Sequence, residues 1–409
     1  MKRRRNVTGT LGVVVVLTVV GLGAVLASGW GWLAAVEGAG DPRPLVVTST
    51  TILADLARQV GGDRVRVYSL LAPGQDPHSY EPVPRDGLAL SRADLVLLNG
   101  YGLDAWAERL LGFRLPAGSP GPAAAGAARA GAAPAGAAPP AAGRGAATSA
   151  AASQPGATSP ATVGPALAAP RGVASGRPPV VRVAEEIPAQ PLPWPADPHR
   201  PDPHLWMDPT LVALYVARIR DALAAIDPAG AGEYRRRADG LQVRLRELDA
   251  WIARQVATVP PGRRLLITTH DAYRYFGRRY GVRVVETVWG ISTEEEPSAA
   301  DLARLFDGLR RYEVPAFVET TINPKLMEEL AAQAGVRIGG QLYADALGPP
   351  GSGAETYTGM MRHNVETIVA ALRGQASHRP PVPPEWERQG FASIQERTGT
   401  RHTRRGPAG

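Results

Sequence analysis

The chain is organised around Asp202-Pro203-His204-Leu205-Trp206-Met207-Asp208-Pro209, which follows a long stretch of low complexity and precedes a strongly patterned helix. Three other stretches have a similar character: Asp76-Pro77-His78, Thr269-His270-Asp271-Ala272-Tyr273 and Tyr343-Ala344-Asp345. Each places a possible metal ligand in a loop that follows an apolar, strand-like run or opens a helix. We therefore expect four side chains to close on one transition-metal ion, which the protein captures without converting it: His78, His204, His270 and Asp345.

Taken singly, each of these histidines also has an ordinary explanation. His78 follows Pro77 and fits a turn, His204 fits a hydrogen bond within its loop, and His270 fits a pair with Asp271 at the edge of a core. The metal hypothesis therefore depends on the combination of separate stretches. The other histidines fall in a Pro-rich stretch, in the closing helix and in the C-terminal tail: His199, His363, His378 and His402.

The composition suits two domains with substantial hydrophobic cores, because 44% of the 409 residues are hydrophobic. The net charge is +7, but the excess arginine lies in short clusters such as Arg235-Arg236-Arg237, which suit solvated helix faces. Nucleic-acid binding needs a continuous basic stripe or a known motif, and the sequence contains neither. The count of cysteines is zero, which excludes disulfides, thiolate ligands, a cysteine nucleophile and lipid attachment through cysteine.

Residues 1–40 have the pattern of an export segment. A basic run, Lys2-Arg3-Arg4-Arg5, precedes residues 11–36, which contain no charged side chain. Val25-Leu26-Ala27-Ser28, which ends in two small residues, fits a signal-peptide cleavage site, and the apolar stretch is also long enough to span a bilayer uncleaved. Both alternatives predict an exported protein, and the second predicts one that stays tethered by its N-terminal helix.

The rest of the chain predicts an α/β fold with two lobes, each built on a mostly parallel sheet flanked by helices. Apolar strand-like runs alternate with helical patterns in residues 41–115 and 180–230, and the same alternation recurs in residues 261–375. A single long helix, residues 231–260, connects the lobes. Residues 116–179 are rich in Ala, Pro and Gly and predict a disordered insertion, and residues 376–409 predict a loose basic tail.

Five motifs resemble, in the same order, those of the metal-specific substrate-binding proteins of bacterial ABC importers, whose two lobes are joined by one rigid helix. The resemblance covers about residues 45–375 apart from the insertion. It implies a monomer that is not an enzyme, binds metal through His78, His204, His270 and Asp345, and hands the ion to a membrane permease. The motifs are PGQDPHSYEP (73–82), DPHLWMDP (202–209), THDAYRYF (269–276), GISTEEEPS (290–298) and LYADALG (342–348).

Zinc is the expected ion. A histidine at position 270 is similar to the zinc-type branch of that family, whereas manganese-type members tend to carry glutamate there. Three imidazoles and one carboxylate also suit four-coordinate Zn²⁺, while Mn²⁺ prefers more oxygen ligands. The zinc branch often carries a histidine-rich loop, whereas the insertion at 116–179 contains no histidine. We therefore expect the insertion to have no role in gathering metal.

Two alternatives remain open on the sequence. One is a manganese- or iron-binding importer component. The other is a secreted metallohydrolase, which would need an open coordination position and a general base such as the glutamate of His-Glu-x-x-His, a pattern absent from this sequence.

Overall fold

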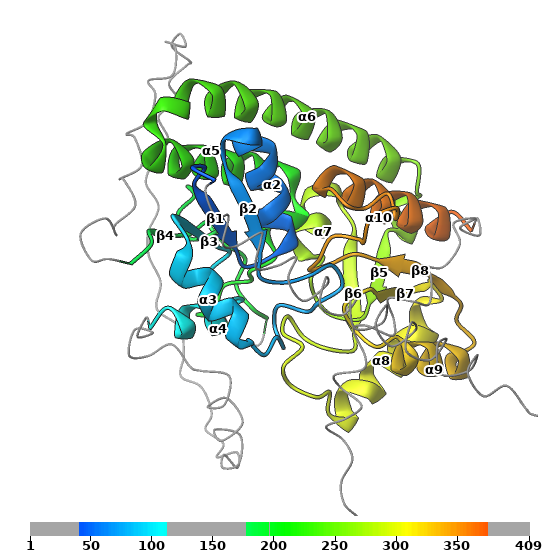
Figure 1. Ribbon diagram of the computed structural model, residues 1–409. Coiled ribbons are helices and arrows are strands. Elements are labelled where there is room, and N and C mark those ends of the chain that lie inside the picture. The colour runs from blue at the N-terminus through cyan, green and yellow to red at the C-terminus, as the bar shows by residue number, and fades with distance from the viewer. Residues whose placement is uncertain (1–40, 113–176, 196, 375–409) are drawn as a thin grey trace, which may run out of the picture. The chain divides into compact units, whose positions relative to one another are not determined.

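Two four-stranded parallel sheets organise the structure, one in each lobe (Figure 1). The structure, a computed structural model, describes residues 41–112, 177–195 and 197–374. Our expectations for residues 1–40, for residues 376–409 and for all but the last three residues of 116–179 lie outside the described residues. Of the helices described, none combines the length and the apolar composition that a membrane crossing requires.

In the N-terminal lobe the strands lie in the order β2-β1-β3-β4, with every neighbouring pair parallel. β1 and β3 are fully buried, because helices cover both faces of the sheet and a parallel sheet of this kind needs apolar residues on both. Val46 packs toward α2 and α5, and its neighbour Val47 packs toward α3 and α4. The strands are β1 (Leu45–Thr48), β2 (Arg66–Ser69), β3 (Leu95–Leu98) and β4 (Val180–Arg182).

The helices of this lobe are α2 (Thr51–Gly61), α3 (Pro84–Arg92), α4 (Ala105–Leu110) and α5 (Pro209–Ile226). Side-chain caps fix where two of them begin. Thr50 accepts a hydrogen bond from the backbone N–H of Leu53, and Asp208 accepts one from that of Thr210. The short helix α4 was not predicted, because its 6 residues are too few to show a helical period.

The C-terminal lobe repeats this arrangement, with the parallel order β6-β5-β7-β8. This confirms the predicted repetition of the α/β pattern. The strands are β5 (Leu265–Thr268), β6 (Arg283–Thr287), β7 (Ala316–Glu319) and β8 (Ile338–Leu342), and the helices are α7 (Arg274–Tyr280), α8 (Ala299–Tyr312), α9 (Lys325–Ala334) and α10 (Tyr357–Leu372).

The strand β8 ends at Leu342, the first residue of the motif at 342–348, and shows little of the apolar pattern of a strand. β8 contains Gly339 and Gly340, which hide the apolar pattern of a strand. A Cβ atom at Gly339 would lie only 2.8 Å from the ring of Phe317 on β7, so close packing excludes a larger residue there.

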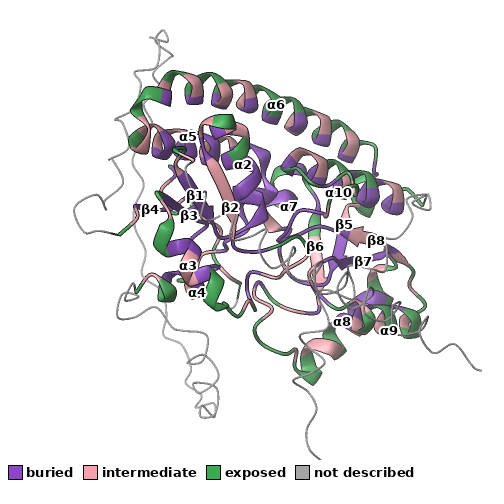
Figure 2. Cartoon of the chain, in the orientation of Figure 1, coloured by how far each residue is buried: buried purple, intermediate pink, exposed green. Residues whose placement is uncertain are grey.

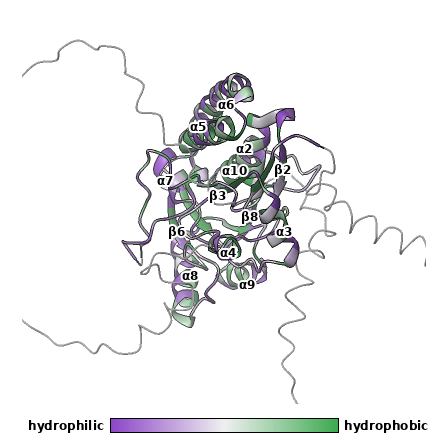
Figure 3. Cartoon of the chain, turned by 60° about the vertical axis from the view of Figure 1, so that its left-hand side comes forward, coloured by the Kyte–Doolittle hydropathy of each residue, from purple (hydrophilic) through white to green (hydrophobic). Residues whose placement is uncertain are grey.

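The long helix α6 (Ala231–Ala257) follows α5 and leads into the second lobe. Its 27 residues span about 40 Å at about 1.5 Å per residue. It packs against α2 and α5 of the first lobe and against α7 and α10 of the second. Its inner face is buried and its outer face is exposed (Figure 2), and Figure 3 shows that α6 is more hydrophilic than the neighbouring α5.

A continuous hydrophobic core lies beneath α6 and includes residues of both lobes. Val46 and Leu53 of the first lobe, Leu245 and Ile252 of α6, and Leu342 of the second lobe belong to the same cluster of buried side chains. The described residues therefore form two lobes in topology but share one core.

Replacing Ile252 by alanine should lower the free energy of unfolding by about 2–5 kcal/mol, because its side chain is fully buried in this shared core. The matched control on the same helix is Val243→Ala. We had placed Val243 on the apolar face, but it is 44% exposed, so the change should stay within about 0.5 kcal/mol. Urea unfolding followed by circular dichroism measures both, and equal midpoints would contradict the role assigned to the buried face.

Candidate metal centre

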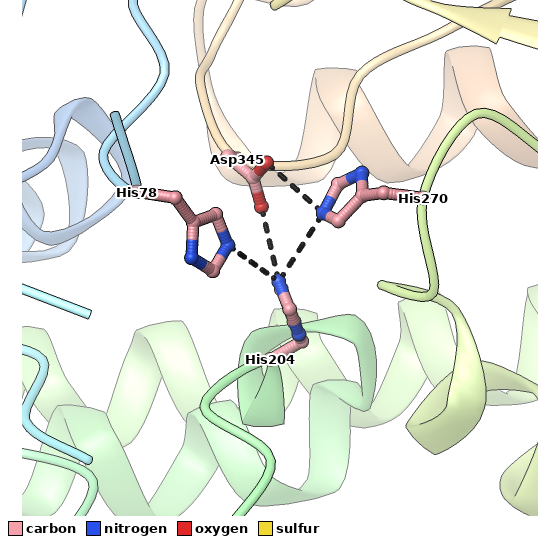
Figure 4. Close-up of side chains that lie close together, drawn as sticks. All are labelled: His78, His204, His270 and Asp345. Atoms are coloured by element: carbon pink, nitrogen blue, oxygen red, sulfur yellow. Dashed lines mark hydrogen bonds and ion pairs between the residues drawn. The ribbon is translucent and has the colours of Figure 1, made fainter. Parts of the chain in front are cut away.

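The structure brings the four predicted ligand residues together at the seam between the lobes (Figure 4). His78 lies in the loop after β2, His204 just before a short turn that leads into α5, His270 just after β5, and Asp345 just after β8. Each contributes one atom to a group in which all four atoms lie within 4.8 Å of one another. The carboxyl ends of parallel strands are where such sheets bind ligands, so the two sheets direct these loops toward one point.

The spacing of the four side chains fits a small tetrahedral ion. The Nε2 atom of His204 lies 3.2 Å from that of His78 and 3.3 Å from that of His270. The oxygens of Asp345 lie 3.4 Å from Nε2 of His204 and 3.2 Å from Nε2 of His270. A tetrahedral ion with bonds of about 2.0–2.1 Å separates its ligands by about 3.3 Å. The two distances between imidazole nitrogens match edges of such a polyhedron, and Asp345 approaches His204 and His270 with a different oxygen each.

Buried carboxylates orient two of the three imidazoles. Asp202 accepts hydrogen bonds from the backbone N–H of His204 at 3.0 Å and from its Nδ1 at 2.8 Å. Glu319 accepts one from the backbone N–H of His270 at 2.9 Å and another from its Nδ1. Because a carboxylate only accepts, Nδ1 carries the proton in both rings and Nε2 faces the site.

The sequence interpretation did not assign these two orienting roles. It paired His270 with Asp271 as an alternative, and this was wrong, because the ring contacts Glu319. The signals were present: Asp202 stands two residues before His204 in the same motif, and Glu319 ends β7, the parallel neighbour of β5.

Asp345 is 1% exposed, and apart from the two imidazoles no described residue contacts its oxygens as a hydrogen-bond donor. Burial opposes its ionisation, but the charges and hydrogen bonds of His270 and His204 hold its pKa well below the usual value. A buried carboxylate whose partners are only two imidazoles requires a positive charge nearby.

The loop of Asp345 is fixed to the first lobe, since Trp206 donates to the Ala344 carbonyl at 2.8 Å and the backbone N–H of Leu347 donates to the hydroxyl of Thr51 at 2.8 Å.

The three imidazoles differ in their affinity for protons. Burial opposes charge on His204, but hydrogen bonds to Asp202 and Asp345 raise its pKa to about 9. Burial likewise opposes charge on His270, and the charges of Glu319 and Asp345 raise its pKa well above the usual value. Burial dominates at His78, whose pKa is well below the usual value. The carboxylates around the centre thus favour protons on His204 and His270 when no metal ion is bound.

The remaining histidines lie outside the centre. His363 in α10 donates from Nε2 to the carbonyl of Gln341 at 2.9 Å, and His199 is exposed. His378 and His402 lie beyond the described residues. Within the described part of the chain, no second group of three or more potential ligands comes together in this way.

Comparison with known proteins agrees with this geometry. The family described as "Zinc-uptake complex component A periplasmic" (ZnuA) matches residues 46–371. The chain belongs to this family. The family comprises metal-binding periplasmic substrate-binding proteins, which are components of ABC importers and not enzymes.

Several relatives are similar over most of their length. The manganese-binding lipoprotein MntA of Halalkalibacterium halodurans is 34% identical over 80% of this chain and 88% of its own. The zinc-binding protein TroA of Treponema pallidum is 32% identical over 82% of this chain and 91% of its own. The solved structure of the same periplasmic zinc-binding protein TroA matches with a TM-score of 0.63 and 30% identity, over 81% of this chain and 99% of that one. This confirms the predicted two-lobe α/β fold.

Metal affinity should fall as the pH falls below about 9. Below that pH, protons compete with the metal ion for the ring nitrogens of His204 and His270, whose pKa values are raised. Where both rings are protonated, the loss should approach 100-fold per pH unit. Calorimetric titration in two buffers of different ionisation enthalpy measures the affinity and the protons released. An affinity that stays constant from pH 9 to about 6.5, the usual pKa of histidine, would contradict these environments.

Replacing Glu319 by glutamine should weaken metal binding about 10–100-fold, because the ring of His270 loses the carboxylate that orients it. The control is Asp271→Asn, which removes a carboxylate adjacent in sequence that does not hold the ring and should leave affinity near the wild-type value. Competition with a fluorescent chelator gives both constants. Equal losses in the two variants would argue against the orienting role of Glu319.

Proposed function

We propose that this chain captures Zn²⁺ outside the cytoplasm and delivers it to the permease of an ABC importer. The observation that carries this proposal is the group of three imidazoles and one buried carboxylate, whose four ligand atoms lie within 4.8 Å of one another. This donor set suits a tetrahedral zinc site. His78, His204, His270 and Asp345 are the proposed ligands.

The donor set favours a borderline-soft transition metal. Ca²⁺ and Mg²⁺ require six or more oxygen ligands, or several retained waters, and a buried group with three nitrogens offers neither. Zn²⁺ accepts this mixture of nitrogen and oxygen in four-fold coordination. The Irving–Williams order places Cu²⁺ above Zn²⁺ at such a site, so the ion carried also depends on which metals are available.

The same group supports holding an ion over catalysis with it. Four protein ligands complete a tetrahedral sphere, whereas catalytic zinc sites use three and keep one position for water. Two of the proposed ligands come from each lobe, so a small movement at the seam is enough to open the site. This suits capture followed by release.

Manganese is the second candidate. The relatives include proteins named for manganese, such as MntA at 34% identity, and one named for iron, YfeA of Yersinia pestis, at 28%. One feature of the site favours it: both oxygens of Asp345 point into the group. Bidentate binding by this carboxylate would raise the coordination number and the share of oxygen ligands, which suits Mn²⁺.

Export and a membrane partner complete the proposal. Relatives bear names that describe periplasmic proteins or lipoproteins of ABC transporters. We propose that residues 1–40 direct export, that the mature protein acts as a monomer, and that the loops around the seam contact the permease.

Zinc should stabilise the wild-type protein by about 2.7 kcal/mol at a free concentration 100 times the dissociation constant, which raises the melting temperature by several degrees. His204→Ala should abolish this shift, because His204 contacts all three other ligands. The matched control, exposed His199→Ala, should keep it. Differential scanning calorimetry of metal-free protein measures all three.

Elemental analysis of protein purified without added metal, together with competition between Zn²⁺ and Mn²⁺ at matched free concentrations, identifies the ion. We expect one zinc per chain and preference for Zn²⁺. Preferential retention of manganese would replace zinc by the second candidate, and no thermal shift with either ion would overturn the proposed function.

A further inference from the structure

His78 is held differently from the other two imidazoles of the centre. His204 and His270 each donate from Nδ1 to a buried carboxylate. The Nδ1 atom of His78 has no such partner among the described residues, and its ring makes its one hydrogen-bond-range contact through Nε2 to His204. The place of this ring therefore depends on where its backbone is fixed.

Asp76 fixes that backbone. Its Oδ1 accepts a hydrogen bond from the backbone N–H of His78 at 2.9 Å. Its Oδ2 accepts one from the hydroxyl of Ser79 at 3.0 Å, within the same loop, and one from the hydroxyl of Thr293. Thr293 belongs to the other lobe, in the loop between β6 and α8. Through Asp76, the hydroxyl of Thr293 thus ties the His78 loop of one lobe to the opposite lobe.

This tie lies where the centre comes nearest to solvent. His78 is 8% exposed, whereas the other three proposed ligands are 0–1% exposed. A small pocket borders His78, and Ser292 and Glu294, which flank Thr293 in sequence, form part of its wall. Tyr101 and Arg200 of the first lobe line it from the other side. Among the four proposed ligands, His78 is thus the one nearest to solvent, and it lies beside the loop of Thr293.

We propose that the hydrogen bond from Thr293 to Asp76 is a latch between the lobes that sets the rate of metal release. The inference rests on the proposed function in that it requires a bound metal ion, but it does not depend on which ion is carried. With the bond formed, the loop keeps His78 in place as the fourth ligand. With the bond broken, His78 is free to move away with its loop, and water enters beside three remaining ligands. Thr293 is a positioning residue that acts through Asp76.

The test measures release from the full-length protein loaded with Zn²⁺, by stopped-flow transfer to an excess of a chromophoric chelator. Thr293→Val keeps the shape of the side chain and removes its hydroxyl. Because bonds to a charged acceptor are among the stronger hydrogen bonds, we expect release about tenfold faster. Thr293→Ser restores the hydroxyl and should release within about twofold of the wild-type rate. The same order of rates is expected with Mn²⁺, since His78 is a proposed ligand of either ion.

Ser79→Ala is the matched control, because it removes a hydrogen bond to the same oxygen of Asp76 from within the same lobe. Its release rate should stay close to that of the wild type. Equal acceleration in Ser79→Ala and Thr293→Val would overturn the latch and assign the effect to the loop alone. The melting temperature of the metal-free protein should fall by a similar small amount in Thr293→Val and Ser79→Ala, since each variant loses one hydrogen bond to the same oxygen of Asp76. A much larger fall in Thr293→Val would assign its faster release to a general loss of stability and overturn the latch.

The outcomes also separate the latch from the proposed function. If the wild type binds metal and Thr293→Val releases it at the wild-type rate, the latch is wrong and the proposed function stands. If the wild type takes up neither Zn²⁺ nor Mn²⁺, both fail.

Discussion

The charge balance of the metal centre depends on one buried carboxylate. Asp345 is 1% exposed and faces imidazole nitrogens from both lobes. A negative charge in such a place is stable only beside a positive one. In the metal-free protein, protons on His204 and His270 supply that charge, and the raised pKa values of both rings express it. A divalent cation supplies the same charge from a position between the ligands. Metal ions and protons thus compete for one electrostatic role.

The three imidazoles of this centre are not held equally firmly. Asp202 and Glu319 lie fully buried and fix the rings of His204 and His270. Glu319 is the last residue of β7, so its place is set by the sheet itself. His78 stands instead in a long loop between β2 and α3 and has no carboxylate on its ring among the residues described. Buried carboxylates therefore fix the rings of His204 and His270, and a loop carries the third ring.

Much of this arrangement could be predicted from the sequence. Apolar runs such as 45–48 and 95–98 indicate buried strands, and their alternation with helical patterns indicates parallel sheets. The four proposed ligand residues were found because each lies in a distinctive motif of a connecting segment. The resemblance of five motifs to one family supported the prediction of a metal site more strongly than any single histidine could.

The parts that could not be predicted depend on contacts between distant residues. Glu319 is 49 positions from His270, and only the pairing of β5 with β7 places it behind that ring. Thr293 is 217 positions from Asp76, and no local pattern indicates their contact. The strand β8 shows little of an apolar pattern because close packing against Phe317 requires glycine at 339.

The core beneath α6 has a consequence for the way a transport partner tells a full carrier from an empty one. Since buried side chains of both lobes belong to one cluster, the scaffold has no interface along which the halves can part widely without exposing apolar surface to water. A wide separation of the halves on loading or release is therefore unfavourable. A transport partner that must detect the bound metal ion then cannot rely on a large change of shape. It has to contact the exposed loops near the ion, whose positions depend on whether the ion is bound.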